Sequence, residues 1–340
     1  MKYEVTTNNI PFDLNPGDEV VLVDDVYEPF VINGLHGEPN APIVIRAKSK
    51  HGAVMPHFHI HDSHDVIIDG LHSKDSGIGI RVGRDNYKEC SESTHDVSVL
   101  NCKIEDMNWW GMGISSCPQF PTHDIIVDGC DIRGVHTNGN GHCIKMSSWV
   151  KEKHGHGVII QNCRIGDPYY HCIQASNGWD DVTVRYNKLY NLNSTNTADH
   201  PGDWGGVRFG TTVTGIAEYN EIWGNLWAFY LQEYPNNIHI RKNYIHDANV
   251  AFFLREVKGD VWITENWLQN NKRDLVLSTG QPYEIKTPEH YVYENNEQVT
   301  ERPPELTEPP VEPPVEPPVE PPTPGIKRYK VSGYFEVEEV

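Results

Sequence analysis

One set of residues along this chain of 340 residues could bind and cleave a charged polymer. Cationic and amide side chains recur at one position of a repeated unit, and aromatic residues stand close to them in the sequence. Cations and amides pair with carboxylates, and aromatic faces stack on sugar rings. The set is Arg81, Ser115, Lys145, Gln174, Arg208, Tyr230 and Phe253, with His142 and His171 beside it and Trp109, Trp110, Tyr169, Tyr170 and Trp204 in adjoining loops. It predicts a binding groove for an acidic polysaccharide, against the alternative of an ordinary solvated sheet face.

Two kinds of cleavage chemistry fit residues of this region. A lyase needs a base beside the uronate carboxylate and a positive group for the charge that develops, and Lys145 with Arg208 could supply them. A glycoside hydrolase needs two carboxyl groups at a set separation, for which the candidates are Asp199, Asp203, Glu233 and Asp167. A glycan-binding protein without turnover is the third hypothesis. The sequence leaves all three open.

These residues are carried by a repeat of short strands. Its clearest copy is Val158–Ile165, in which apolar and polar residues alternate. The other copies start at Val97, Ile125, Val182, Ile238 and Val261, and looser ones start at Val66 and Gly215. A second apolar strand follows in every copy, and the copies recur every 23 to 33 residues, roughly the length of a solenoid repeat. Period-two alternation indicates strands, so we expect an all-β, single-stranded parallel β-helix of about eight or more coils.

One position of the repeat carries cysteine or asparagine in every clear copy. The residues are Cys102, Cys130, Cys163, Asn187, Asn220, Asn243 and Asn266. They are expected to point inward at one corner, where the asparagines can bond along the axis as in stacked sheets. Cys143 and Cys172 share another position, and the seven cysteines are therefore interpreted as buried, reduced thiols rather than a disulfide framework.

The sequence divides into five segments. We expect an N-terminal cap over 1–42, the parallel β-helix over 43–280 and an extension over 281–302. Residues 303–325 are a Pro/Glu array typical of a stiff polyproline II tether. Residues 326–340 alternate like a strand without a partner of its own, which predicts a docking element for another subunit.

The opening of the chain resembles a known superfamily. The stretches Pro16–Leu22 and Gly37–Ala47 are similar to the start of right-handed parallel β-helix proteins of the pectate-lyase-like superfamily, and of its chondroitinase B and alginate lyase branch in particular. The resemblance covers residues 16 to about 280 and implies that the coil is right-handed. It also implies a lysine base with an arginine, which Lys145 and Arg208 match, and calcium held by acidic or amide ligands.

Charge and composition restrict the partners. The net charge of −20 argues against nucleic acid and anionic membrane, and no apolar run is long enough to span a bilayer. We expect no secretory signal, although the fold is typical of proteins that act outside cells. The tether and docking strand therefore suggest an extracellular or virion-associated phage tailspike-type component, with other virion subunits as partners and a homotrimer as its assembly. A non-catalytic structural or glycan-binding virion protein is the alternative.

Eighteen histidines raise the question of a metal. His57, His59, His61 and His64 are dense enough to hold an adventitious ion, but we predict no structural or catalytic metal there. The pairs His64-Asp65, His95-Asp96 and His123-Asp124, together with Gly155-His156-Gly157, start successive copies of the repeat and are interpreted as turn residues.

Overall fold

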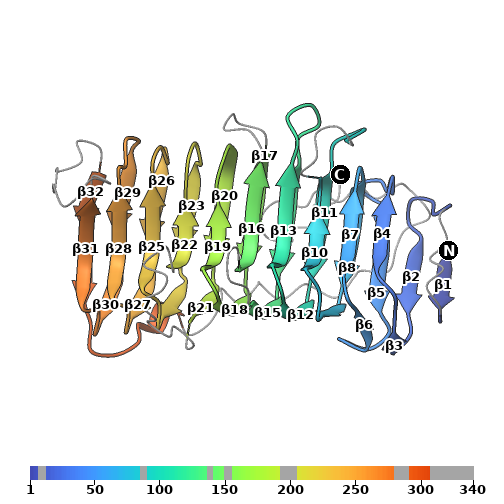
Figure 1. Ribbon diagram of the computed structural model, residues 1–340, viewed down its shortest axis with the longest axis horizontal. Coiled ribbons are helices and arrows are strands. Elements are labelled where there is room, and N and C mark those ends of the chain that lie inside the picture. Colours follow the sequence, from blue (N-terminus) through green and yellow to red (C-terminus); the bar gives the residue numbers. More distant parts are fainter. Residues whose placement is uncertain are drawn as a thin grey trace, which may run out of the picture.

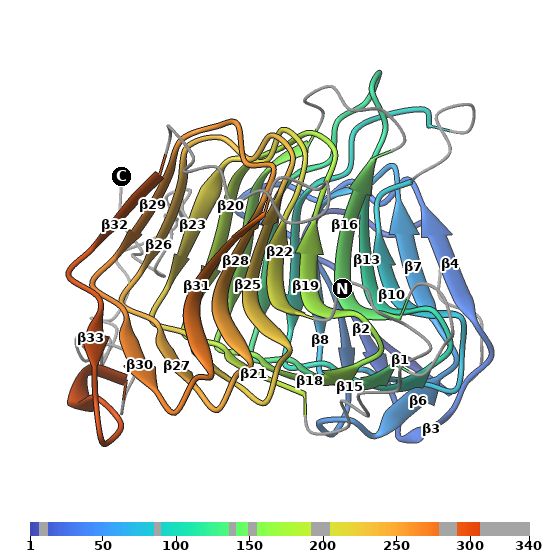
Figure 2. The same cartoon turned by 60° about the vertical axis from the view of Figure 1, so that its left-hand side comes forward.

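The computed structural model describes residues 1–6, 13–84, 90–135, 141–148, 155–191, 205–278 and 291–306. Within these ranges the regular elements are β-strands and one 3₁₀ turn, η1 (Pro304–Leu306). The strands form three long sheets that wrap around one interior (Figures 1 and 2). No helix in the described ranges has the length and apolarity needed to cross a membrane.

Sheet A has 12 strands. Neighbouring strands come from successive coils and pair in parallel, so each rung lies directly on the next. Its strands are β1 (Lys2–Val5), β2 (Glu19–Leu22), β5 (Ile43–Ala47), β8 (His64–Asp69), β11 (His95–Leu100), β14 (His123–Asp128), β17 (Gly155–Gln161), β20 (Trp179–Arg185), β23 (Gly215–Glu218), β26 (Ile238–Arg241), β29 (Val261–Thr264) and β32 (Tyr291–Glu294).

Sheet B has 11 strands in the same coil order. They are β3 (Asp25–Val26), β6 (Ala53–Met55), β9 (His72–Lys74), β12 (Lys103–Met107), β15 (Asp131–Val135), β18 (Arg164–Pro168), β21 (Lys188–Tyr190), β24 (Glu221–Trp223), β27 (Tyr244–His246), β30 (Trp267–Gln269) and β33 (Glu297–Gln298).

Sheet C has 10 strands and carries the predicted cationic and amide residues Arg81, Lys145, Gln174 and Arg208. They are β4 (Phe30–Asn33), β7 (Phe58–His61), β10 (Ile78–Val82), β13 (Trp110–Ser116), β16 (His142–Ser148), β19 (His171–Ala175), β22 (Gly205–Phe209), β25 (Trp227–Gln232), β28 (Val250–Arg255) and β31 (Arg273–Ser278). Figure 1 shows these strands side by side along the whole solenoid.

The core is one continuous apolar column. Alternate residues of each strand point inward, and the buried cluster runs from Val5 to Leu268 without a break. Each coil can bury its apolar face only against its neighbours, so stability accumulates along the axis. The predicted all-β parallel solenoid is confirmed.

The inward asparagines form the predicted ladder. The Asn220 Oδ1 accepts hydrogen bonds from the backbone N–H and the side-chain amide of Asn187, at 3.1 and 3.0 Å. Asn243 receives the same pair from Asn220, and Asn266 from Asn243. Asn296 adds a further rung that the repeat pattern did not include. Because each amide is also a donor to a core-strand carbonyl, this buried polar column is internally satisfied.

The solenoid extends beyond both expected boundaries. Strands β2, β3 and β4, which the sequence placed in the cap, already pair in parallel with β5, β6 and β7. At the other end β32 and β33 pair with β29 and β30 beyond residue 280. These strands are short and have no strong periodicity of their own. Pairing with the next coil forms them, so their sequence pattern does not mark them as part of the solenoid.

The cysteines follow the prediction with one exception. Cys102, Cys130, Cys163, Cys143 and Cys172 are free and buried. Cys90 and Cys117, which fall outside the repeat positions, form a disulfide. The expectation of thiols throughout is therefore wrong for this pair. The first residues of the predicted tether form the 3₁₀ turn η1 rather than polyproline II. Residues 307–340 lie outside the described residues, so the rest of the tether, the docking strand, the virion role and the trimer stay predictions.

Candidate functional site

The strand register places the predicted cations and amides in one row on sheet C. Its members face one another across neighbouring strands, and we call them the sheet C row: Arg81, Gly113, Lys145, Gln174, Arg208, Tyr230 and Phe253. The prediction that Ser115 belongs to this row is wrong. Ser115 pairs with Ser147, two residues further along, because the register aligns Gly113 with Lys145. Arg208 is thus separated from Lys145 by the one strand that carries Gln174.

Gly113 leaves the space in which the neighbouring tryptophan lies. A Cβ at this position would be 3.1 Å from Cε3 of Trp110. The Trp110 ring in turn lies 4.6 Å from Nζ of Lys145 and 5.9 Å from the guanidinium carbon of Arg81. Such distances allow cation–π attraction, so the ring holds the lysine side chain on the row.

The surroundings of the Lys145 amine lower its pKa and so favour its neutral form. Burial, together with the nearby positive charge of Arg208, lowers the pKa of Lys145 to about 8. Both effects disfavour the ammonium form. A useful fraction of the amine is therefore neutral near physiological pH, which is the form that can accept a proton.

Two buried histidines lie beside this row. The rings of His142 and His171 stack at 5.5 Å, and Tyr170 and Tyr230 stack on their outer faces at 5.6 and 6.0 Å. Burial holds the pKa of both histidines well below the usual value, with the charges of Lys145 and Arg208 acting in the same direction. Both imidazoles are therefore neutral and act as hydrogen-bonding groups rather than as cations.

Several polar atoms of this face are buried without a hydrogen-bond partner among the described residues. They include Nδ1 of His142, Oε1 of Gln174 and Nε of Arg208. Leaving such atoms unpaired costs free energy, of the order of 1–3 kcal/mol each. A cluster of them around two cations is typical of a site whose remaining partners come from a ligand.

Arg208 is oriented by the predicted site residue Tyr230 and by Gln232, which lies on the same face of β25. Its Nη2 donates to Oε1 of Gln232 at 2.6 Å, and its guanidinium lies 5.3 Å from the Tyr230 ring. The Tyr230 hydroxyl donates to the same Gln232 oxygen at 2.8 Å, and Arg255 reaches that hydroxyl at 3.5 Å. Gln232 lies two residues after Tyr230, so strand alternation was the signal that places it on the same face.

Aromatic side chains rim the row on both sides. Trp227 stacks on Phe253 at 4.6 Å and contacts Tyr230 at 5.0 Å. At the other side Trp109 is half exposed and stacks on Trp110 at 5.7 Å. Tyr169 packs edge-on against Tyr170 at 5.1 Å. Predicted aromatic binding residues therefore lie where a sugar ring could stack, except Trp204, which is outside the described residues.

The carboxylates expected for a hydrolase are not brought together in the described residues. Asp199 and Asp203 lie outside them. Glu233 follows β25 in the left-handed conformation, at φ 69°, and its carboxylate accepts a hydrogen bond from the Thr211 hydroxyl. It is not a member of the sheet C row, so the described part of the site holds no carboxyl pair around Lys145.

The described residues do not fit the calcium site that the resemblance implies. The row and the rings stacked on it offer ammonium, guanidinium, imidazole and amide groups, whereas calcium selects several carboxylate and carbonyl oxygens. Of the four clustered histidines, the rings of His57 and His59 stack at 4.3 Å and those of His59 and His61 lie 6.0 Å apart, whereas His64 is on another sheet. His59 and His61 lie on β7 with pKa values lowered to about 3 and about 4 by burial, while His64 starts β8 in sheet A.

Comparisons with known proteins agree with this architecture. A family described as "Right handed beta helix region" matches residues 146–288. No curated protein sequence matches the chain. Three similar solved structures show the same coil along most of the chain.

The first similar structure is a mannuronic acid specific polysaccharide family 6 lyase from human gut microbiota, with 14% identity, a TM-score of 0.61 and coverage of 88% of this chain and 82% of that one. An alginate lyase from Paenibacillus sp. str. FPU-7 has 17% identity and a TM-score of 0.60 over 86% of this chain and 99% of that one. The GH136 lacto-N-biosidase from Eubacterium ramulus has 14% identity and a TM-score of 0.56 over 84% of this chain and 62% of that one. The fold is a right-handed parallel β-helix.

Proposed function

We propose that this protein is a polysaccharide lyase that cleaves an acidic, uronate-containing glycan by β-elimination, with Lys145 as the base. The observation that carries the proposal is the half-buried Lys145 amine, whose pKa is about 8, in one row with Gln174 and Arg208. The similarity to two lyases, one described as mannuronic acid specific and one as an alginate lyase, supports the substrate class.

The geometry supports a definite sequence of bond changes. The neutral amine of Lys145 removes the proton on the carbon next to the uronate carboxylate, and the C–H electron pair moves toward that carboxylate. Arg208 and Gln174, which follow Lys145 in the row, donate hydrogen bonds to the carboxylate as its charge grows. The electrons then form the C4–C5 double bond while the C4–O bond to the next sugar breaks. Solvent protonates the leaving oxygen, and the lysine ammonium returns its proton to solvent.

The remainder of the face suits a polymer rather than a small acid. Strands of a sheet are about 4.8 Å apart, close to the repeat of an extended glycan, so successive sugars can lie over successive rungs. Trp227 and Phe253 offer a stacked aromatic platform two and three strands away from Gln174. We therefore expect the chain of the glycan to run along the solenoid axis over sheet C.

The test is an assay on alginate, polygalacturonate and chondroitin, each with added calcium and with a chelator. A lyase produces unsaturated ends that absorb in the ultraviolet, in step with new reducing ends. We expect such products from one polyuronate, and their loss in Lys145→Met but not in Lys188→Met, a control on the exposed part of β21 in sheet B. Reducing ends without absorbance would replace the lyase by a hydrolase. No shortening of any glycan would overturn the proposed activity.

A further inference from the structure

Five histidines stack along the edge of sheet A at which its strands begin. The residues assigned to cleavage lie on a different sheet, sheet C. The rings of His36, His64, His95, His123 and His156 follow one another at centroid distances of 4.9, 4.9, 4.7 and 4.7 Å, with interplanar angles from 1° to 11°. We call this column the histidine stack. The interpretation as turn residues explains why each coil begins there, but not why imidazoles recur.

Most of the stack pairs each imidazole with its own carboxylate. The Nδ1 atoms of His64, His95 and His123 lie 2.9, 2.7 and 2.8 Å from a carboxylate oxygen of the following aspartate. Those aspartates have left-handed backbones, with φ of 53°, 50° and 54°, which direct the carboxylate back to the ring.

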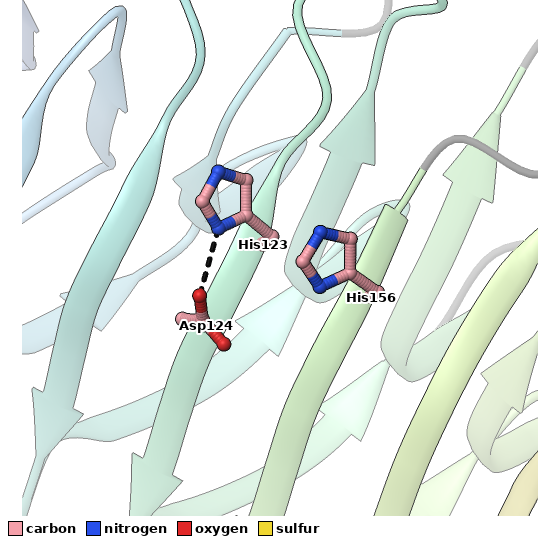
Figure 3. Close-up of side chains that lie close together, drawn as sticks. All are labelled: His123, Asp124 and His156. Atoms are coloured by element: carbon pink, nitrogen blue, oxygen red, sulfur yellow. Dashed lines mark hydrogen bonds and ion pairs between the residues drawn. The ribbon is translucent and has the colours of Figure 1, made fainter.

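The pattern changes at the last member. His156 is followed by Gly157, which keeps the left-handed backbone at φ 65° but has no carboxylate. A Cβ at Gly157 would be 2.5 Å from Oδ1 of Asp124, so the aspartate of the preceding coil occupies the space that a side chain would fill. No hydrogen bond to the His156 ring is found among the described residues. Asp124 thus lies beside the two stacked imidazoles, and its printed hydrogen bond is to His123 (Figure 3).

His123, Asp124 and His156 together present the donor atoms of a metal site. One ligand atom from each lies within 4.8 Å of the others, and Asp124 and His156 are exposed to solvent. Two imidazole nitrogens and a carboxylate oxygen are a donor set typical of zinc and its neighbours in the first transition series. The same set is poor for calcium and magnesium, which prefer oxygen ligands throughout.

We propose that His123, Asp124 and His156 bind one divalent transition-metal ion, with zinc as the reference ion, and that the ion links β14 to β17 across two coils. In a tetrahedral zinc site the ligand atoms are roughly 3.4 Å apart, so ligand atoms that lie up to 4.8 Å apart must approach by as much as about 1.4 Å. The imidazoles lie at the surface and can tilt out of the stack to do so. Water fills the positions that the protein leaves open.

The site is independent of the proposed lyase activity. It lies on sheet A and uses no residue of the sheet C row, so its loss should leave the cleavage of glycans unchanged. Because the ion would bind the folded coils and not the unfolded chain, it should stabilise the fold in proportion to its concentration. Acidification should release it, since imidazole and carboxylate must be deprotonated to act as ligands.

The experiment is calorimetric titration of the full chain, with any polyhistidine tag removed, using Zn²⁺, Co²⁺ and Ca²⁺. In the titration we expect one equivalent of Zn²⁺ to bind and Ca²⁺ to give no heat. In a separate absorption measurement, bound Co²⁺ should give the visible spectrum of nitrogen and oxygen ligation. His156→Ala should weaken Zn²⁺ binding at least tenfold. His95→Ala, a matched change in the same stack at a residue with its own aspartate, should change it less than twofold.

Two results would overturn the site. The first is absence of Zn²⁺ binding to the wild-type protein, and the second is equal weakening in the His95 and His156 variants. A further measurement separates ligation from folding: without metal both variants should melt near the wild-type temperature, and Zn²⁺ should raise that temperature in wild type and His95→Ala but not in His156→Ala. A metal-dependent rise that persists in His156→Ala would also contradict the proposal.

Discussion

The asparagine ladder inside the solenoid and the sheet C row outside it are built by the same stacking rule but differ in their chemistry. In the ladder, like residues follow one another, and each amide of Asn187, Asn220 and Asn243 bonds to the next rung and to a core carbonyl. In the row, unlike residues follow one another, and Gln174 and Arg208 keep buried polar atoms without partners among the described residues.

The difference indicates where stability and function are located. A polar column that satisfies itself contributes to the fold, because every buried donor and acceptor has a partner. A row that brings two cations close together beside neutral imidazoles, with some buried polar atoms left without partners among the described residues, costs stability. Such costs are concentrated at functional sites. In a repeat protein the functional site can therefore be recognised at the positions where the repeat is no longer regular.

The largest effect is expected from changing the base itself. Lys145→Arg keeps the positive charge of the row but removes a group that can become neutral near pH 8, so the rate of elimination should fall by about 10³-fold or more. The measurement is kcat/KM on the polyuronate that the wild-type protein cleaves. Full activity of this variant would show that the base is another residue.

The ladder should instead respond in stability. Asn243→Ala removes an amide that bonds to Asn266, Ala217 and Arg241 and accepts from Asn220. Because buried groups on both sides lose their partners, the free energy of unfolding should fall by about 2–4 kcal/mol. Chemical denaturation measures this, with the exposed Asn236→Ala as the control. Equal effects of the two changes would remove the contrast between the ladder and the surface.

The pH dependence of cleavage tests the electrostatics of the row. The lysine acts as a base only in its neutral form, and its pKa is about 8, so kcat/KM should rise as the pH increases through that value. Between pH 7 and pH 9 the neutral fraction rises about tenfold. A rate that is flat over this range, or that falls, would mean that deprotonation of Lys145 is not required.

A smaller effect on cleavage is expected from a change at Gly113, beside the Trp110 ring that holds Lys145 in the row. Gly113→Ala would bring a methyl group within 3.1 Å of the Trp110 ring and displace the ring on which the Lys145 amine lies. We expect an approximately fivefold loss in kcat/KM. Gly77→Ala is the matched control, because a Cβ there meets nothing within 4 Å. Equal activity of the two variants would show that Trp110 does not position the lysine.

Much of this architecture could be predicted from the residues alone, because strand alternation and the Cys/Asn column both report inward-facing positions. Asn187 to Asn266 were placed correctly since a one-residue shift would expose them. The row was harder. Ser115 was assigned in place of Gly113 because side-chain chemistry, not register, guided the choice, and a glycine gives no chemical signal.

Other parts depended on partners that a linear pattern does not show. The orienting role of Gln232 comes from its contact with Arg208 on the neighbouring strand, 24 residues away. The neutral state of His142 and His171 comes from burial, which the sequence does not report. The Cys90–Cys117 disulfide joins two residues outside the repeat. Expectations for Asp199, Asp203 and Trp204 stay predictions.

The central claim, that the sheet C row binds a uronate for elimination, is tested most directly by a structure of Lys145→Met bound to a uronate oligosaccharide. The account predicts that the glycan lies along sheet C with one carboxylate bonded to Arg208 and Gln174. The hydrogen on the neighbouring carbon should then face position 145. A glycan bound on sheet A or sheet B, or one whose carboxylates point away from Arg208, would contradict it.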